Sequence, residues 1–551
     1  MTTRARPRYD ADVIVVGAGI AGALVAERLA KSGARVKIVE AGPRIDRGKA
    51  VVRFYDALVK VPECAYPNTA YAPHPRSDDL DAYYVQTGPQ KFASTYVRQV
   101  GGTTWHWLGT CLRLVPDDFR LATKFGRGVD WPIGYDTLEP WYGQAENAIG
   151  VAGDSGEDLG SPRSQPYPMP AIAASFLDRH VAQAFTGTPY QVRATPQGRN
   201  SVVREDRPPC CGNNSCIPIC PIQAKYDATV HVARAEAAGA RLMAQAVVQF
   251  IEVGADRNVT AIRFKRPDGS GGRLTAKVFV LAAHAMEIPK LLLMSRGPGA
   301  PDGVANASDM VGRHLMDHPV QLSYALAGVP VWPYRGPLST SGVENTRAGD
   351  WRATRPSFRI EIGNDGWSWP TGAPTTDAQQ LAAAGLRGTE LQKAIRDRTS
   401  RQLRFGTLTE QLPDPANRIV PDFDRRDALG IPRPRIAYRL DDYTKAGLAE
   451  ARRIHEEAFV RLKGTQIHHN PDDRFQGAGH VMGTARMGRD ARTAVVDADL
   501  RTFDHPNLFI EGSAVFPTGG AANPTLTIAA LALRSVDAIR ATLAASVGPA
   551  R

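Results

Sequence analysis

The chain has 551 residues, of which 43% are hydrophobic and 22% charged, so it is long enough for a large buried core and for more than one domain. It contains neither a run of eighteen uncharged apolar residues nor the apolar stretch of a secretory signal, so we expect no membrane span and no export signal of its own. The formal net charge of +11 comes from Lys and Arg interleaved with Asp and Glu, which argues against a nucleic-acid partner and leaves an acidic protein or an anionic membrane face open.

A nucleotide-binding pattern begins near the N-terminus, where a β-branched apolar run over residues 11–16 predicts a strand buried on both faces. A glycine-rich turn and a helical stretch follow: Gly17 permits the tight bend, Gly19 lets a pyrophosphate approach the backbone, and Gly22 lets the helix pack on the strand. A second apolar strand ends in Glu40, an acid placed to hydrogen-bond ribose hydroxyls. The pattern predicts a dinucleotide site but does not choose between FAD and NAD.

The cysteines are concentrated in one segment. Four of the six lie within eleven residues, at positions 210, 211, 216 and 220, which is not the spacing of a disulfide framework. The CxxC pairs of a zinc finger are absent, and the side chains of adjacent cysteines diverge, so they rarely ligate one centre together. Three thiolates, from Cys210, Cys216 and Cys220, fit a [3Fe–4S] cluster better than tetrahedral zinc or a four-cysteine centre. Structural zinc and disulfides are the alternatives.

Further motifs lie at residues 100–107 (VGGTTWHW), 131–140 (WPIGYDTLEP), 310–319 (MVGRHLMDHP), 480–488 (HVMGTARMG) and 523–527 (NPTLT). In this order they resemble the glucose-methanol-choline (GMC) oxidoreductases, and similar segments run from Asp12 to Ile539. The chain resembles above all that family's bacterial membrane-complex branch, the large subunits of FAD-dependent glucose, gluconate, fructose and sorbitol dehydrogenases, which carry a similar cysteine segment and a [3Fe–4S] cluster. Two places depart from the family pattern: residues 284–289 lack its small residue and Thr, and His314 replaces a usual Asn.

The resemblance implies that the cofactor is FAD. It also implies that Gly101 and Gly102 approach the isoalloxazine and that Val248 or its neighbour Val247 lies on the adenine. Gly512 and Ser513 would close over the pyrophosphate and ribityl chain. Some relatives attach the flavin covalently to a histidine in the place of His106, whereas others with the same Trp-His-Trp leave it free. We expect noncovalent FAD, and an ordinary packed histidine is the alternative for His106.

Alcohol oxidation needs a group that takes the hydroxyl proton while the C–H hydride moves to flavin N5. His480 lies in a glycine-rich loop and is neutral near pH 7; the residues alone would favour a structural histidine, but the resemblance puts His480 in the place of the family's base. Asn523 falls on the partner position, where its amide can orient the carbinol oxygen; capping the helix over residues 525–540 is its other expected role. Glu410 resembles a glutamate beside the substrate cavity, with a solvated strand residue as the alternative.

The predicted fold class is α/β: a Rossmann-like FAD-binding domain, discontinuous in sequence, with an α+β substrate-binding domain built on an antiparallel sheet. Residues 10–319, which include the cysteine cluster, are expected to form the FAD-binding domain and residues 320–470 the substrate-binding domain. Residues 471–545 are expected to return to the FAD-binding domain with the catalytic residues.

Together, these expectations predict a dehydrogenase of a sugar or polyol, and C1 of glucose is the favoured site of oxidation. Its electrons would leave through the cluster to a cytochrome c. By the resemblance, its partners are a small subunit that bears an export signal and a multihaem cytochrome c. They would hold the enzyme on the periplasmic face of the inner membrane; the cytoplasm is the alternative. Competing possibilities are an oxygen-using pyranose or alcohol oxidase, a dehydrogenase of gluconate or of C2 or C3 of a glycoside, and an FAD-binding subunit without turnover.

Overall fold

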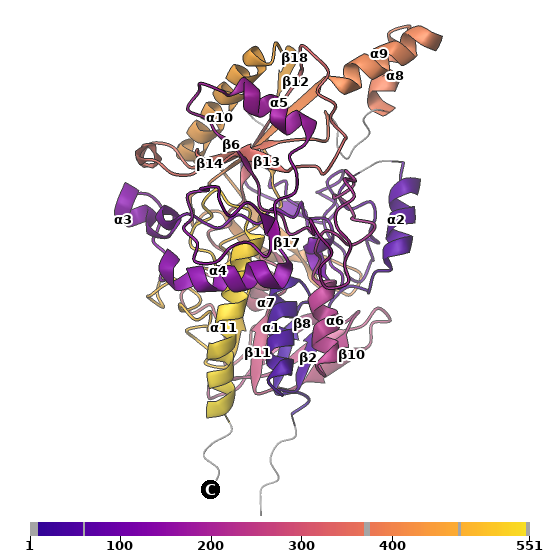
Figure 1. Cartoon of the computed structure of the whole chain (residues 1–551). Coiled ribbons are helices and arrows are strands. Elements are labelled where there is room, and N and C mark those ends of the chain that lie inside the picture. The colour runs from indigo at the N-terminus through magenta and orange to yellow at the C-terminus, as the bar shows by residue number, and fades with distance from the viewer. Residues whose placement is uncertain (1–8, 59–60, 368–374, 472–474, 547–551) are drawn as a thin grey trace, which may run out of the picture.

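The computed structural model describes residues 9–58, 61–367, 375–471 and 475–546. Residues 1–8 lie outside these ranges, as do residues 472–474, which follow the expected domain boundary at residue 470. A parallel sheet with helices forms one half of the molecule and an antiparallel sheet the other, at the bottom and top of Figure 1. The predicted α/β class, with a Rossmann-like half and a second half on an antiparallel sheet, is confirmed.

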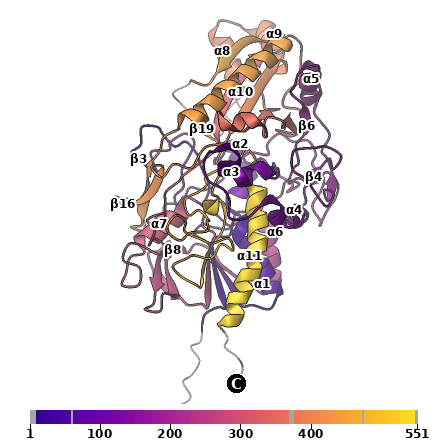
Figure 2. The ribbon, with the colours of Figure 1, turned by 90° about the vertical axis from the view of Figure 1, so that its left-hand side faces the viewer.

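The parallel sheet has the strand order β20-β11-β1-β2-β7, and every neighbouring pair is parallel. The strands are β1 (Val13–Val16), β2 (Val36–Val39), β7 (Arg241–Met243), β11 (Val278–Leu281) and β20 (Leu508–Ile510). All residues of β1 and β11 are buried, as expected for parallel strands covered on both faces. Helices α1 (Ile20–Lys31), α6 (Thr229–Ala237) and α11 (Thr525–Ala545) pack together beside the sheet (Figure 2).

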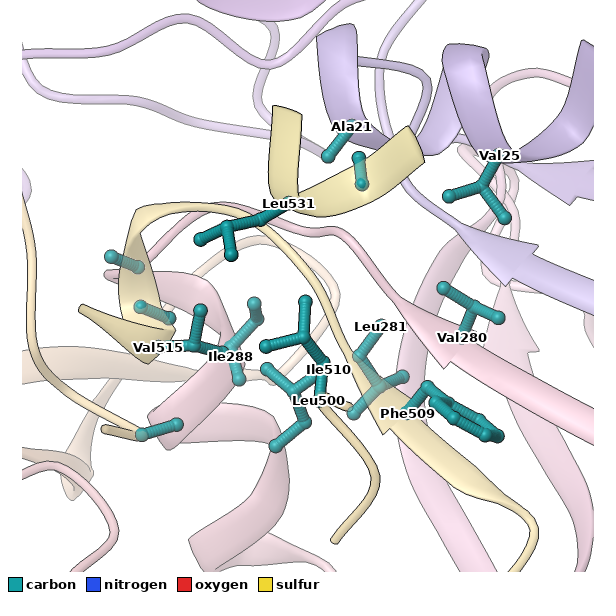
Figure 3. Close-up of a cluster of buried hydrophobic side chains, with 14 of the residues drawn as sticks. Ala21, Val25, Val280, Leu281, Ile288, Leu500, Phe509, Ile510, Val515 and Leu531 are labelled. Carbon is teal, nitrogen blue, oxygen red and sulfur yellow. The ribbon is translucent and has the colours of Figure 1, made fainter. Parts of the chain in front are cut away.

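The largest core lies between the parallel sheet and its helices. Figure 3 shows it as a cluster of hydrophobic side chains from segments far apart in sequence: Ala21 and Val25 of α1, Val280 and Leu281 of β11, Ile288 of α7 (Glu287–Met294), Phe509 and Ile510 of β20, and Leu531 of α11. Each fully buried Val, Leu, Ile or Phe side chain contributes about 1.5–3 kcal/mol to folding. This packing fixes the ends of the parallel strands, from which the loops of the candidate site start.

The antiparallel sheet runs in the order β18-β12-β15-β14-β13-β6, with β19 paired to β12. Its strands are β6 (Val192–Ala194), β12 (Pro319–Leu326), β13 (Ser341–Val343), β14 (Phe358–Ile362), β15 (Gln402–Thr409), β18 (Thr465–His469) and β19 (Gln476–Gly477). Alternate residues face opposite ways: Ala325 and Phe405 pack under α10 (Asp442–Arg461), whereas Leu322, Tyr324 and Arg404 line a cavity on the other face. The strand period therefore divides this sheet into a core face and a cavity face.

Smaller elements complete the described fold. The remaining strands are β3 (Val85–Gln86), β4 (Ala152–Gly153), β5 (Met169–Pro170), β8 (Val247–Val253), β9 (Val259–Lys265), β10 (Gly271–Leu274), β16 (Arg418–Arg426) and β17 (Pro432–Ala437). The remaining helices are α2 (Arg47–Asp56), α3 (Leu121–Phe125), α4 (Tyr135–Ile149), α5 (Phe176–Ala184), α8 (Thr375–Ala383) and α9 (Gly388–Ser400), the last two projecting from the top in Figure 1. No helix in the described ranges has the length and apolarity to cross a membrane.

Candidate active site

A cavity of about 740 Å³ lies where the carboxyl ends of the parallel strands meet the cavity face of the antiparallel sheet. Loops after four parallel strands reach it, through Gly17, Glu40, Ala282 and Gly512. This is the edge at which ligands bind in α/β sheets. The sequence-predicted residues that line the cavity are Gly17, Gly19, Glu40, Gly102, His106, Val248, Gly512, Ser513, His480 and Asn523.

The start of α1 forms one end of the cavity. Gly19 is its N-cap, no side chain caps the helix, and a Cβ at this position would meet no atom within 4 Å. Free N–H groups at a helix N-terminus beside open space suit a pyrophosphate. Gly17 has φ +106°, a backbone conformation that favours glycine. Gly22 does not line the cavity, and a Cβ on Gly22 would overlap the carbonyl oxygen of Gly17. Gly22 therefore brings the helix close to the turn.

Glu40 holds this turn from the end of β2. Its carboxylate accepts the backbone N–H groups of Ala18 (2.8 Å) and Gly42 (2.9 Å), and burial raises its pKa above the usual value. Because Glu40 also lines the cavity, it is in position both to fix the glycine turn and to face a bound nucleotide.

The wall opposite the glycine turn is built from residues 99–110. Gly102, at φ +55°, begins a short helical turn, and a Cβ there would lie 3.1 Å from Cα of Gly19; Gly101 itself lies outside the lining. Four residues that line the cavity carry buried polar atoms with no hydrogen-bond partner within the described part of the chain: Gln99 (its amide), His106 (Nε2) and Thr110 (Oγ1) in this wall, and Glu511 (Oε2) beside it. Unpaired buried polar groups are expensive, so this wall fits a polar cofactor such as FAD.

The glycine-rich loop before His480 is tied to its surroundings through the backbone. The carboxylate of Asp317 accepts the N–H groups of His480 (3.0 Å) and Ala478 (3.2 Å), and Ser94 donates its hydroxyl to the same carboxylate. Burial raises the pKa of Asp317 to about 6. Asp317 therefore positions the loop that carries His480.

The ring of His480 contacts two polar side chains. Its Nδ1 lies 2.8 Å from Nδ1 of His318, and its Nε2 lies 3.5 Å from Nδ2 of Asn523. Burial, with His318 and the Arg359 cation nearby, lowers the pKa of His480 well below 6.5, so the ring is neutral at pH 7. A neutral imidazole beside an amide can accept a proton from a hydroxyl group held between them.

Asn523 precedes α11 but its side chain does not cap it. Pro524 is the N-cap and no side-chain cap bond is formed, so the expected capping role is absent. Instead, Oδ1 of Asn523 accepts a hydrogen bond from Nη1 of Arg359 at 3.4 Å, while Nδ2 faces His480. The amide is thus directed toward the cavity.

Glu410 lies outside the cavity lining. It is fully buried, and its carboxylate accepts hydrogen bonds from Nη2 of Arg352 (2.9 and 3.0 Å) and the hydroxyl of Ser357 (2.9 Å). The carboxylates that do line this part of the cavity are Glu361 and Asp365, which sequence reasoning missed.

The cysteine segment borders the cavity through Ile217. None of the six cysteines, all within the described ranges, is in a disulfide. No group of three His, Cys, Asp or Glu side chains among the described residues, Cys210, Cys216 and Cys220 included, is arranged to hold a metal ion. The ligand set expected from the spacing is therefore not assembled in this structure.

Comparison with known proteins places this geometry in a family. Residues 413–532 match the GMC oxidoreductase model and residues 15–46 the NAD(P)-binding Rossmann-like domain model. The chain is 38% identical to the fructose dehydrogenase large subunit of Gluconobacter japonicus (96% of this chain, 98% of the relative) and 30% identical to paromamine 6'-oxidase of Streptomyces fradiae (96% and 91%). A crystal structure of pyridoxine 4-oxidase from Mesorbium loti, 19% identical, covers 97% of this chain and 99% of its own, with a TM-score of 0.63. The chain belongs to the GMC oxidoreductases, FAD-dependent enzymes that oxidise CH–OH groups.

Proposed function

We propose that the protein is an FAD-dependent dehydrogenase that oxidises a carbinol of a sugar or polyol, with His480 as the base. The observation that carries the proposal is the pair of polar atoms at the cavity, Nε2 of His480 and Nδ2 of Asn523, 3.5 Å apart. A carbinol oxygen between them would donate its proton to His480 while accepting the N–H of Asn523. Bound FAD supplies the hydride acceptor, N5.

Polar side chains on the antiparallel sheet favour a substrate with several hydroxyl groups. Arg404 and Asp365 form a bidentate ion pair at the cavity wall (2.8 and 2.7 Å), beside the carboxylate of Glu361 and the ring of Trp367. Such a wall offers both donors and acceptors to a sugar. Glucose at C1 is our first candidate; fructose, the substrate in the name of the 38% identical relative, stands beside it, with gluconate and C2 or C3 of a glycoside as rivals.

We also propose a [3Fe–4S] cluster on Cys210, Cys216 and Cys220, although their thiols must move together to hold it. Backbone N–H groups already point at two of the sulfurs, from Gly212 to Cys210 (3.4 Å) and from Lys225 to Cys220 (3.5 Å). When bound, such a cluster transfers single electrons.

Buried positive charge beside these cysteines supports an anionic group there. Arg199 is 1% exposed, and its Nε and Nη1 have no hydrogen-bond partner among the described residues. Its cation opposes the rise that burial causes in the pKa of Cys210. Lys225, also 1% exposed, donates to the carbonyls of Trp105 (3.0 Å) and Cys216 (2.7 Å), so it joins the cysteine segment to the cavity wall. A thiolate-bound cluster would compensate both cations.

The proposed partners are a small subunit that carries the export signal and a multihaem cytochrome c that takes the electrons. The name of the fructose dehydrogenase large subunit, which implies companion subunits, supports this arrangement. It would hold the enzyme at the periplasmic face of the inner membrane through its partners, with the cytoplasm as the alternative.

The function is tested by assaying the purified holoenzyme against a panel of sugars and polyols, with a dye and with oxygen as acceptors. We expect sugar-dependent dye reduction with little oxygen consumption. In His480→Ala, flavin reduction should fall about 1,000-fold while the flavin spectrum is retained. Oxygen consumption that rivals dye reduction would instead indicate an oxidase, the activity in the name of the 30% identical relative.

The cluster is tested by iron analysis and electron paramagnetic resonance of Cys216→Ser, because Cys216 is one of the three expected ligands. We expect this variant to lose iron and keep FAD. Cys211→Ser, which changes the exposed neighbouring cysteine, should keep both. Equal iron in Cys216→Ser and the unmodified protein would rule out the assignment.

A further inference from the structure

We propose that a hydrogen-bond chain with one fixed direction holds His480 in the tautomer whose Nε2 is free to accept a proton, and that His318 and Arg359 are the positioning residues that set this direction. The inference rests on the proposed role of His480 as base. Neither positioning residue lines the cavity, so each acts through a neighbour.

The first end of the chain is a backbone carbonyl. Nε2 of His318 lies 2.9 Å from the carbonyl oxygen of Gly520, which can only accept, so this nitrogen must carry a hydrogen. Burial lowers the pKa of His318 to about 4, so the ring is neutral at pH 7 and its Nδ1 holds a lone pair. The 2.8 Å contact between the two Nδ1 atoms then requires His480 to donate. Its Nε2 is left unprotonated.

The second end is a guanidinium, which can only donate. Arg359 is fully buried and ion-paired with Glu344 (2.8 Å) and with Glu361, so its charge is balanced and its position fixed. Its Nη1 donates to the side chain of Asn523, so the amide atom that faces Arg359 must be the oxygen, Oδ1. The amide nitrogen, Nδ2, then faces His480. An N–H group from Asn523 again requires Nε2 of His480 to be an acceptor.

Both ends therefore demand the same tautomer by independent contacts. In the other tautomer, Nε2–H would face the carbinol, two donors would oppose each other at Asn523, and the proton could not be taken. A histidine base held in the wrong tautomer costs a serine protease about 10⁴ in rate. His318 is thus required for the orientation of the base rather than for substrate binding.

Two amide substitutions at His318 separate its two hydrogen bonds. His318→Asn can place an amide oxygen where Nδ1 lies and keep the acceptor for His480, whereas His318→Gln can keep the donor to Gly520 and removes that acceptor. The control is His455→Asn: His455 is equally buried and hydrogen-bonded to Thr407 and Ser323, but packs on the other face of the antiparallel sheet.

The measurement is the rate of flavin reduction in the holoenzyme by stopped flow, with the best sugar found in the panel. We expect His318→Asn to stay within about 10-fold of the unmodified protein and His318→Gln to lose about 100-fold in rate, with KM and the flavin spectrum little changed. His455→Asn should stay within about 2-fold. Equal losses in the Asn and Gln variants, or a loss in KM alone, would overturn the inference.

Two substitutions of Arg359 test the other end of the hydrogen-bond chain. Arg359→Lys keeps a donor-only cation opposite Asn523 and should retain more activity than Arg359→Gln, whose amide can turn an acceptor toward Asn523. The reverse order contradicts the proposed direction. If no sugar or polyol reduces the flavin of the unmodified holoenzyme, the proposed function fails. If the unmodified enzyme is active but the variants rank in the wrong order, only the inference about the tautomer of His480 fails.

Discussion

Backbone strain occurs at both places that depart from the family pattern: at His284, the first residue of the segment 284–289, and at His314. His284 has φ +72° and His314 φ +62°, in the left-handed region that Gly and Asn tolerate best. His284 offsets its strain by stacking on Tyr96, with ring centroids 4.2 Å apart. His314 is buried with neither ring nitrogen hydrogen-bonded among the described residues, so nothing offsets its strain.

We predict that His314→Asn stabilises the protein by about 1 kcal/mol, because Asn tolerates this left-handed φ better than His. The measurement is the thermal midpoint of the holoenzyme, which should rise. The same substitution in helix α10, His455→Asn, removes two hydrogen bonds and should lower the midpoint. A lower midpoint in His314→Asn would contradict the strain argument.

Local motifs predicted some site residues, whereas long-range packing supplied the others. His480 and Asn523 could be singled out because each lies in a recognisable segment. Arg359 and His318 could not be given roles, because they meet Asn523 and His480 across 164 and 162 residues of sequence. The family resemblance predicts Glu410 beside the cavity, but which acidic side chain faces the cavity depends on the register of the strands, which one sequence does not reveal.

At the level of elements, two glycine turns lie directly against each other at the cavity. The turn before α1 contributes Gly19 and the short helix over Gly102–Trp105 contributes Gly102, with little space between them for a side chain. The strand, turn and helix around the first of these turns can be predicted from sequence, because each of its glycines serves a local backbone requirement.

Gly102→Ala should weaken FAD binding about 10-fold or more, since its Cβ would enter the cleft beside Gly19. The measurement is the flavin content and the dissociation constant of FAD. Gly126→Ala is the matched control, because Gly126 also has a left-handed φ (+67°) but a Cβ there meets no atom within 4 Å. FAD affinity reduced equally in both variants would show that strain alone, not intrusion, is responsible.

The antiparallel half was harder to predict because its strands break the simple pattern. Strand β14 reads FRIEI, an alternation typical of one solvated face, yet all five residues are buried. Arg359 and Glu361 can be buried because they pair with each other, and Arg359 also pairs with Glu344, a partner that tertiary structure brings to the strand.

For the whole molecule, buried neutral histidines dominate the expected response to acid. Outside the cavity lining, burial lowers the pKa to about 3 at His74, His231, His314 and His455. In the unfolded chain these groups titrate near 6.5, so the unfolded state binds protons first as the pH falls. Each therefore removes about 1.4 kcal/mol of stability per pH unit below 6.5.

We accordingly predict a lower thermal midpoint at pH 5 than at pH 7, at constant ionic strength. Asp317 and Asp118 act in the opposite direction, because burial raises the pKa of each to about 6 and the folded state then binds the proton first. The histidines outnumber them, so stability should fall on acidification. An equal or higher midpoint at pH 5 would show that these histidines are not neutral in the folded protein.

The strand order of the parallel sheet also determines when the flavin site can form during synthesis. Strand β20, which completes the sheet that β1 begins, comes from residues 508–510, and Asn523 follows it. A ribosome must therefore release the chain through Asn523 before the cavity has all its walls. Cofactor loading is then a late step of biogenesis, and a nascent chain stalled before β20 should remain flavin-free.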